Sequence, residues 1–329
     1  MIEKIFITGG TGFLGANLVR KLCSSGKDVT ILVHGKKDHP FLKGLKIKRK
    51  IGNVRDYNSV LKSMKGCNYV YHLAAILAPN VRGKNDMFDV NIIGTENVMR
   101  AALENKIRKI VHTSSTSVFG YSKKKKQRIN EKSEYQTEKD QNSYGYSKKL
   151  AEEKVLDYVA KGLNATIIHP CSIVGEGEET PLFLTLVKSI SKGRIKFVFP
   201  GGTSFVDVGD VVRGLILAME HGKKGQRYIL SSHYMELIEQ FNAIAEELKK
   251  PPIRIRLPKI SYYPALMIAK IMEKTIKNPL ITVEALKHAY GYRNFDSSKA
   301  KKELGWKPKV SYQESVSKAI EYYKKHKSF

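Results

Sequence analysis

Cysteine is scarce in this sequence: the 329 residues include only Cys23, Cys67 and Cys171, which lie far apart. This spacing matches no zinc-binding pattern and is too sparse for a disulfide framework, so we expect a reducing compartment and no metal site. Long apolar runs are lacking as well. No stretch approaches the about 18 residues of a membrane span, and the first apolar stretch is too short for the core of a signal peptide. We therefore expect a cytoplasmic protein without a transmembrane segment.

Acidic residues are also in short supply. The chain has 31 Asp and Glu against 58 Lys and Arg, which gives a formal net charge of +27. Such an excess suggests nucleic acid, an anionic membrane surface or an anionic substrate as a partner. However, the excess is spread along the chain: residues 1–165 hold 31 basic and 15 acidic residues, and residues 166–329 hold 27 and 16. The one dense run, at 123–126, has no aromatic residues among its lysines. We interpret the charge as a solvated lysine-rich surface and expect no specific nucleic-acid partner.

The first half of the chain alternates short apolar segments with amphipathic ones. The segments that we expect to be strands are 4–8, 28–33, 46–51, 68–73, 107–113 and 164–169, and the expected helices are 13–25, 57–64, 86–105 and 143–161. Strands that alternate with helices in this way are typical of a parallel sheet covered by helices on both faces. We predict an α/β fold with a doubly wound, Rossmann-like parallel sheet, in which residues 1–170 form a dinucleotide-binding domain.

The alternation breaks after Pro170, where glycine and proline become frequent. We expect a smaller C-terminal substrate-binding domain made of residues 171–204 and 231–329, while residues 205–230 return to the first domain. Within 258–284, apolar residues at 266, 267, 268, 271 and 272 form a broad helical stripe. Two interpretations stay open for this helix: it packs on the core of the second domain, or it is a lid or membrane-touching helix over an apolar substrate.

A glycine-rich turn joins the first predicted strand to the first predicted helix. It reads Thr8-Gly9-Gly10-Thr11-Gly12-Phe13-Leu14-Gly15. A helix N-terminus presents unpaired N–H groups and a partial positive charge, and therefore binds a pyrophosphate. Glycine is needed where the backbone turns tightly, approaches phosphate or packs against a strand. Placed between strand and helix, this turn predicts a dinucleotide cofactor.

A tyrosine and a lysine in a later helix suggest proton-transfer chemistry. Tyr144 and Lys148 are four residues apart and therefore share one face of the predicted helix. A phenol has a pKa near ~10, and a nearby ammonium lowers it towards the working range. The hydroxyl-rich segment 113–117 follows the preceding strand and can hold a substrate oxygen. Tyr146 is a rival, but Leu150 stands where its lysine would be needed, so we expect Tyr146 to be structural.

On these residues the chain resembles the extended short-chain dehydrogenase/reductase superfamily, the NAD-dependent epimerase/dehydratase group. Within it, the chain is similar to the dihydroflavonol-reductase-like, the 3β-hydroxysteroid-dehydrogenase-like and the hopanoid-associated epimerase-like branches. The resemblance covers most of the chain and continues through segments 52–56, 72–75, 91–95, 295–299 and 304–308.

The resemblance implies roles for single residues. Ser115 would donate a hydrogen bond to the substrate, Tyr144 would be the acid/base, and Lys148 would tune Tyr144 and bind the nicotinamide ribose. Asn91 either helps to bridge a water molecule to Lys148 or is structural. The cofactor-binding positions that the resemblance implies are Gly9, Thr11, Gly12, Phe13, Leu14, Gly15, His34, Lys36, Lys37, Asn53, Val54, Leu73, Ala74, Ala75, Thr113, Tyr144, Lys148, Pro170, Ser172 and Ile173. Asn53 departs from the family, which has an adenine-contacting aspartate there.

The end of the second predicted strand favours one nicotinamide cofactor over the other. An NAD-specific fold places an acid there to bind the ribose 2′-hydroxyl. Residues 32–37 contain no acid but include Lys36 and Lys37, which would attract a 2′-phosphate. We expect NADP(H), with NAD(H) as the alternative.

These features together predict an NAD(P)-dependent oxidoreductase that reduces a ketone or aldehyde, or oxidises an alcohol, on a bulky and partly apolar substrate. Two alternatives stay open: a nucleotide-sugar epimerase or dehydratase that holds NAD tightly, and a dinucleotide-sensing scaffold. The epimerase needs arginines for a second diphosphate, and the candidates are Arg194, Arg213, Arg254, Arg256 and Arg293. Peripheral membrane contact and a homodimer also stay open.

Overall fold

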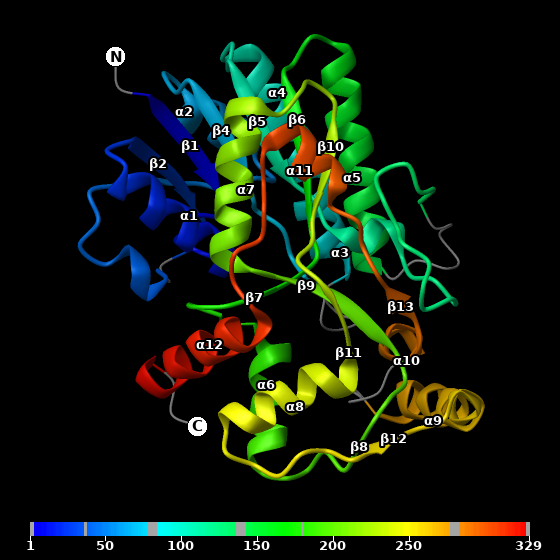
Figure 1. The fold of residues 1–329 in the computed structure, drawn as a ribbon. Coiled ribbons are helices and arrows are strands. Elements are labelled where there is room, and N and C mark those ends of the chain that lie inside the picture. Colours follow the sequence, from blue (N-terminus) through cyan, green and yellow to red (C-terminus); the bar gives the residue numbers. More distant parts are fainter. Residues whose placement is uncertain are drawn as a thin grey trace.

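The computed structural model describes residues 3–35, 38–77, 84–135, 143–178, 180–276 and 283–326. Within these residues the largest sheet has seven strands in the order β10-β6-β5-β4-β1-β2-β3, and all neighbours are parallel (Figure 1). The strands are β1 (Lys4–Thr8), β2 (Asp28–Val33), β3 (Lys48–Ile51), β4 (Tyr69–His72), β5 (Lys109–Thr113), β6 (Ala165–Pro170) and β10 (Arg227–Leu230). The doubly wound parallel sheet predicted from the sequence is confirmed.

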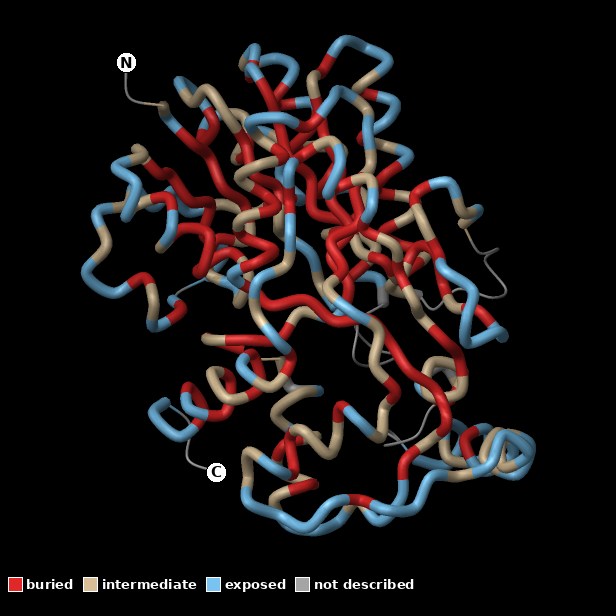
Figure 2. The backbone as a smooth tube through the Cα atoms, viewed as in Figure 1, coloured by how far each residue is buried: buried red, intermediate tan, exposed pale blue. Residues whose placement is uncertain are grey.

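Helices cover both faces of this sheet. One face carries α1 (Phe13–Ser24), α7 (Val208–His221) and α11 (Ser298–Leu304), and the other carries α2 (Tyr57–Met64), α4 (Gly94–Glu104) and α5 (Ser143–Ala160). Neighbouring residues of a strand point to opposite faces, so in β1 Phe6 packs into one apolar core while Ile5 and Ile7 pack into the other. Figure 2 shows these strands as the most buried part of the molecule.

A smaller region follows the carboxyl end of β6. Its strands are β7 (Ser172–Val174), β8 (Phe197–Val198), β9 (Gly202–Asp207), β11 (Tyr234–Glu236), β12 (Ile255–Arg256) and β13 (Tyr292–Arg293), and its helices are α6 (Pro181–Ser191), α8 (Leu237–Glu247), α9 (Tyr262–Thr275), α10 (Val283–Tyr290) and α12 (Tyr312–His326). Strand β9 lies centrally in its sheet, between β11 and β13, and also pairs with β7. Immediately after β9 the chain returns to the large sheet as α7 and β10. No helix in the described ranges is both long and apolar enough to cross a membrane.

The C-terminal tail forms hydrogen bonds with the start of α7, the helix that connects the smaller region to the large sheet. Asp207 caps this helix by accepting from the Gly209 N–H, and it also accepts from the Ser315 hydroxyl at 2.8 Å. One turn later, Asp210 accepts from the backbone of Lys309 at 2.7 Å, and its carbonyl accepts from the buried Trp306 indole at 2.8 Å. Residues 306–315 are thereby fixed against the helix that leads back into the large sheet.

The helix predicted at 86–105 is interrupted. It consists of α3 (Lys84–Phe88), a π-helical turn over Asp89–Ile93, and α4. The turn buries Asn91 completely, and the Asn91 amide pairs with the backbone of Ile76. A polar side chain that satisfies a distant backbone segment in this way is invisible to helical periodicity. Short 3₁₀ turns also occur at Pro40–Leu42, Thr116–Phe119 and Lys259–Ser261.

Candidate active site

The glycine-rich turn is packed so tightly that two of its positions accept no side chain. Gly9 has φ +73°, and a Cβ there would lie 2.6 Å from the Ala74 nitrogen. A Cβ on Gly15 would lie 2.0 Å from the Gly9 carbonyl oxygen. Helix α1 begins after Gly12, which has no side chain to cap it, and its first turn contains no acid. Its uncapped N–H groups fit the pyrophosphate of a dinucleotide.

The turn is joined to the segment that follows β4. The Leu73 N–H donates to the Thr8 carbonyl at 3.1 Å, and the Ala74 N–H donates to the Thr8 hydroxyl at 3.3 Å. That hydroxyl also pairs with Nδ1 of the buried His72 at 2.6 Å. Thr11, Phe13, Leu14, Leu73 and Ala74 are half-buried, whereas Gly12 and Ala75 are exposed. These predicted cofactor positions therefore gather where β1 and β4 end.

The predicted adenine and ribose positions lie beyond β2 and β3. His34 is exposed, and the Asn53 side chain accepts from the Arg55 N–H at 3.0 Å, while Val54 is buried. Lys36 and Lys37 lie outside the described residues. The first acid after β2 is Asp38, which the sequence analysis did not consider, and both Nε and Nη2 of Arg49 donate to it. This ion pair compensates the negative charge of Asp38.

Ser115 and Tyr144 meet beyond the end of β5. Ser115 starts the 3₁₀ turn Thr116–Phe119 and accepts from the Ser117 N–H at 3.1 Å, and Tyr144 lies in the first turn of α5. Burial raises the pKa of Tyr144 to about 12, although its hydrogen bond with Ser115 acts in the opposite direction. From the sequence, Lys148 is expected to lower this pKa. In the structure burial outweighs any such effect, so Tyr144 is protonated at neutral pH.

Lys148 is buried, with 1% of its surface exposed, and its ammonium donates to the Thr113 carbonyl at 2.8 Å. Burial lowers the pKa of Lys148 to about 8, and the charge of Glu152 acts against this fall. The bond attaches α5 to the end of β5, two residues before Ser115. Ser115, Tyr144 and Lys148, which the sequence analysis grouped, thus lie around one strand end.

Glu152 is a site residue that the sequence analysis missed. It is completely buried and accepts hydrogen bonds from the hydroxyls of Ser114 and Tyr135, and it pairs with His169 Nε2 at 2.6 Å. Although burial raises the pKa of Glu152, these partners together hold it below its usual range. The signal was present in the sequence, because Glu152 lies four residues after Lys148 and so shares its helix face.

Asn91 holds neighbouring backbone in place. Its Oδ1 accepts from the Ile76 N–H at 2.8 Å, and its Nδ2 donates to the Ile76 carbonyl at 3.1 Å and to the Ser147 hydroxyl at 2.9 Å. Ser147 in turn donates to the Tyr144 carbonyl at 2.8 Å. Two roles were left open for Asn91: bridging a water molecule to Lys148, or a structural role. These contacts fit the structural role, because they hold α5 in place beside Tyr144.

The remaining cofactor positions predicted from the sequence lie where β6 ends and the chain continues into β7. Pro170 and Cys171 are buried, Ile173 is half-buried and Ser172 is exposed. Burial raises the pKa of the Cys171 thiol to about 12, so the thiol stays neutral and is no nucleophile.

Arg293 on β13 acts electrostatically on this thiol. Within the described ranges its guanidinium has no acidic partner, its buried Nε has no hydrogen bond, and burial lowers its pKa to about 10.

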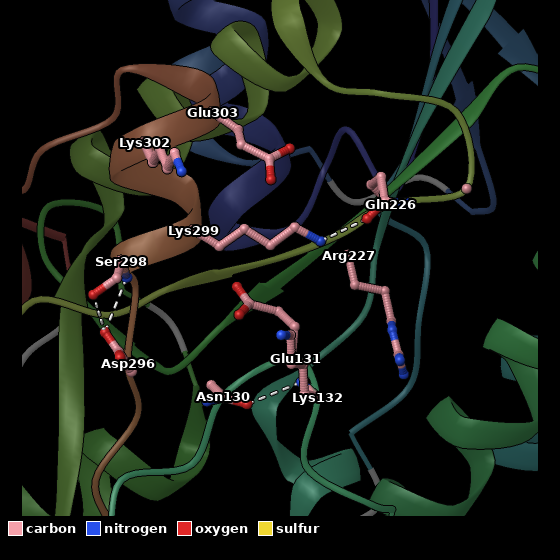
Figure 3. Close-up of a pocket in the computed structure, with 11 residues that line it drawn as sticks. Asn130, Glu131, Lys132, Gln226, Arg227, Asp296, Ser298, Lys299, Lys302 and Glu303 are labelled. Carbon is pink, nitrogen blue, oxygen red and sulfur yellow. Dashed lines mark hydrogen bonds between the residues drawn. The ribbon is translucent and has the colours of Figure 1, made fainter.

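A separate cavity of about 680 Å³ lies between segment 130–132, the start of β10 and α11 (Figure 3). Three of its charged groups are engaged locally: Lys299 donates to Gln226 at 2.7 Å, Glu131 accepts from the Ile229 N–H at 2.8 Å, and Asp296 accepts from Ser298. None of the predicted catalytic or cofactor positions lines it. We therefore place the candidate active site at the strand ends and not in this cavity.

Comparison with known proteins identifies the family. Residues 5–231 match the sequence model of the NAD dependent epimerase/dehydratase family, and the chain belongs to that family. It is therefore an enzyme of the extended short-chain dehydrogenase/reductase type, as the sequence predicted. Solved structures agree: gox2253 has a TM-score of 0.87 and is 28% identical, and each chain covers 99% of the other. The NAD-bound dTDP-glucose 4,6-dehydratase DesIV of Streptomyces venezuelae has a TM-score of 0.78 and is 19% identical, and the alignment covers 98% of this chain and 97% of DesIV. At this identity, the likeness shows a shared fold alone.

Three relatives of known name align over nearly the whole chain. Sterol demethylase protein B of Methylococcus capsulatus is 28% identical over 97% of each chain. A 4-hydroxy-2-methyl-3-oxo-4-farnesyl-3,4-dihydroquinoline-1-oxide ketoreductase of Stigmatella aurantiaca is 26% identical over 95% of this chain and 94% of its own. The 3-beta-hydroxysteroid dehydrogenase of Mycolicibacterium neoaurum is 25% identical over 98% and 92%.

Alanine substitutions at Gly15 and Gly12 of the turn should differ in their effect on stability. Gly15→Ala pushes a methyl group into the Gly9 carbonyl and should lower the free energy of unfolding by about 1–3 kcal/mol, the usual cost of overpacking. Gly12→Ala is the matched control, because its Cβ would lie 3.5 Å from the nearest atom, an ordinary contact. Urea unfolding of both variants checks this. Equal stability of the two would contradict the packing described for Gly15.

Tyr144→Phe removes a proton donor and leaves the ring in place. We expect turnover to fall roughly 10²–10⁴-fold, the range for loss of general acid–base catalysis, with cofactor affinity almost unchanged. Tyr146→Phe is the matched control, because Tyr146 lies on the same helix and packs against Phe88 at a ring distance of 6.2 Å. Steady-state kinetics and cofactor titration measure both variants. Retention of more than a tenth of the turnover by Tyr144→Phe rules out the acid/base role.

The burial of Lys148 predicts a fall in kcat/KM above about pH 8, where this residue loses its proton while Tyr144 keeps its own. Glu152→Gln removes a charge that raises the pKa of Lys148, so the fall should begin at lower pH. Glu153→Gln is the control, because Glu153 is exposed and pairs with Lys149 instead. The pH at which kcat/KM falls does not depend on the fraction of the enzyme that is folded, so a loss of stability in the variant does not change this measurement. An unchanged position in Glu152→Gln would disprove the coupling.

Proposed function

We propose that this member of the NAD dependent epimerase/dehydratase family is a net oxidoreductase, which reduces a ketone or oxidises the corresponding alcohol on a bulky, partly apolar substrate. The observation that carries the proposal is that the Ser115 and Tyr144 side chains meet at the end of β5, beside the buried Lys148 ammonium. A neutral phenol, a second hydroxyl and an ammonium at one strand end are the groups that a carbonyl reduction requires.

Each of these residues has a separate task in the proposed reaction. The Ser115 hydroxyl holds the substrate oxygen and orients it towards Tyr144. Tyr144, whose high pKa keeps it protonated, donates its proton to that oxygen in reduction and becomes a phenolate. In oxidation the reverse step applies, and the phenolate form of Tyr144 takes the proton of the alcohol. The Lys148 ammonium, one helical turn away, stabilises the phenolate that forms when the proton leaves. A bound nicotinamide dinucleotide supplies or accepts the hydride.

The residues proposed to hold the cofactor form a continuous row along the strand ends. Gly9, Gly12 and the first turn of α1 receive the pyrophosphate, and Asn53 and Val54 lie on the adenine side. Thr113, Pro170, Ser172 and Ile173 lie on the nicotinamide side. NADP(H) is proposed over NAD(H), because residues 32–37 bring two lysines and no acid, and because Asp38 is neutralised by Arg49.

The names of the relatives support the apolar substrate class. A sterol demethylase protein, a 3-beta-hydroxysteroid dehydrogenase and a ketoreductase of a farnesylated dihydroquinoline align with this chain over nearly its whole length. Sterols and farnesylated rings share a large hydrocarbon body and one oxygen at the reacting carbon. We propose a substrate of this kind, without assigning a particular compound.

Arg293 favours a second candidate, a nucleotide-sugar epimerase or dehydratase. A half-buried arginine whose guanidinium has no acidic partner within the described residues is suited to an anionic group of the substrate, such as a diphosphate. This reaction would use the same Ser115, Tyr144 and Lys148, but it would return the hydride to the same substrate and would gain from holding the cofactor throughout.

Cofactor exchange separates the two candidates. A net oxidoreductase releases its cofactor in every cycle, so we expect purified protein to be mostly free of dinucleotide and to bind NADPH more tightly than NADH. With a ketone on an apolar ring system it should consume NADPH stoichiometrically. Mass spectrometry of the purified protein, titration of both cofactors and a reductase screen measure these expectations.

Two results would decide against the proposal. Protein that carries bound NAD at near-full occupancy and interconverts a UDP- or GDP-sugar without net cofactor turnover would establish the second candidate. Equal or tighter binding of NADH would overturn the NADP(H) assignment alone. Arg293→Leu is informative in either case, because it should abolish sugar-nucleotide turnover but leave reduction of a neutral ketone nearly unchanged.

A further inference from the structure

Helix α9 turns an apolar face to solvent. Tyr263, Met267, Ile268 and Ile271 are between 53% and 71% exposed, and Ile260, in the 3₁₀ turn before the helix, is 74% exposed. Their spacing of three, four and eight residues places them on one side of the helix. Helices of a folded protein usually bury such a side. The apolar residues predicted to form one stripe at 266–272 are thus divided between two sides of the helix. Residues 267, 268 and 271 face outward, whereas 266 and 272 are half-buried.

The opposite side of α9 is fixed to the protein. Ala269 is completely buried, and Leu266 is half-buried. The ring of Tyr262 packs on Tyr290 of α10 at 5.2 Å, and the Ser261 hydroxyl hydrogen-bonds the Tyr290 hydroxyl at 2.5 Å. The helix lies at the outer edge of the smaller region, where Figure 2 shows it mostly exposed (compare Figure 1). The outward face therefore belongs to a helix whose opposite side is packed against the rest of the protein.

Among the described residues, the charged side chains that lie beside this face are lysines. Lys259, Lys270 and Lys274 are exposed, and on a helical projection the last two lie next to Tyr263 and Met267. Glu273 is the only acid of α9, and its Oε1 accepts from the Val283 N–H at 2.9 Å, where α10 begins. Its carboxylate is thus directed to the connection between the helices, and a row of lysines borders the apolar face.

We propose that this face of α9, composed of Ile260, Tyr263, Met267, Ile268 and Ile271, docks on the surface of a bilayer that contains anionic lipids. Apolar side chains flanked by lysines match the interface between acyl chains and negatively charged headgroups. The 14 residues of α9 span about 21 Å, which is short for crossing the hydrocarbon core, so the helix lies in the plane of the interface. The proposal is independent of the reaction that the enzyme catalyses.

A second copy of the chain fits this face less well. A two-fold symmetric contact through α9 would bring two identical faces together. The lysine rows of both copies would then lie along the same apolar contact with no acid between them, and like charges oppose such an association. An anionic lipid surface instead satisfies the lysines and the apolar residues together.

Vesicle co-sedimentation of the full-length protein tests the proposal. We expect binding to vesicles of phosphatidylcholine mixed with phosphatidylglycerol, weaker binding to phosphatidylcholine alone, and a loss of the difference at high salt, where charge is screened. Ile271→Glu should weaken binding to the anionic vesicles by about tenfold or more, because it removes apolar contact and adds repulsion. Lys270→Gln combined with Lys274→Gln should weaken it on anionic vesicles only.

Ile51→Glu is the matched control. It makes the same chemical change at a residue of β3 that is 89% exposed, and it should bind vesicles as the unaltered protein does. Circular dichroism and thermal unfolding establish that both variants are folded. No binding, or equal binding by Ile271→Glu and the unaltered protein, would overturn the proposal. So would a dimer in light scattering that Ile271→Glu dissociates, because the face would then be a contact between copies.

Discussion

The hydrogen bond from the buried Lys148 ammonium to the Thr113 carbonyl determines how the candidate site is assembled. Placing an ammonium in the interior is costly unless nearby oxygen atoms compensate for the lost water. Here a backbone carbonyl accepts from it directly, and Glu152 adds a negative charge one turn further along the helix. Because the carbonyl belongs to the end of β5, the bond sets the position of α5 against the sheet. Ser115 follows Thr113 by two residues, and Tyr144 precedes Lys148 by one turn, so this one contact brings their hydroxyls together.

The smaller region depends on the same edge of the sheet. The chain enters it directly after Pro170, returns through α7 and leaves again after β10, and its C-terminal tail is fixed to α7 by Asp207 and Asp210. Cys171 and Arg293 therefore come from different passages of the chain and still influence one another electrostatically. The parts proposed to hold substrate are thus built on the strand ends that carry the proton-transfer residues.

The two proposals concern different surfaces and support a common picture. An apolar, ring-containing substrate of the kind named for the relatives partitions into bilayers. An enzyme that docks through α9 would meet such a substrate at the membrane and would not have to extract it from water. The basic excess of the chain, which its sequence distributes without a nucleic-acid pattern, agrees with attraction to an anionic surface.

The sequence by itself determined those features that depend on residues close together in the chain. The glycine turn was predictable because it lies between a strand and a helix, and the pairing of Tyr144 with Lys148 because four residues make one helical turn. The parallel sheet was predictable from the alternation of its segments. Only the tertiary structure decided which groups meet from distant segments: Thr113 with Lys148, Glu152 with His169, Asn91 with Ile76, and Asp38 with Arg49. It also decided which side of α9 faces outward and that Arg293 is half-buried with no acidic partner among the described residues, because burial is set by packing between segments and not by spacing along the chain.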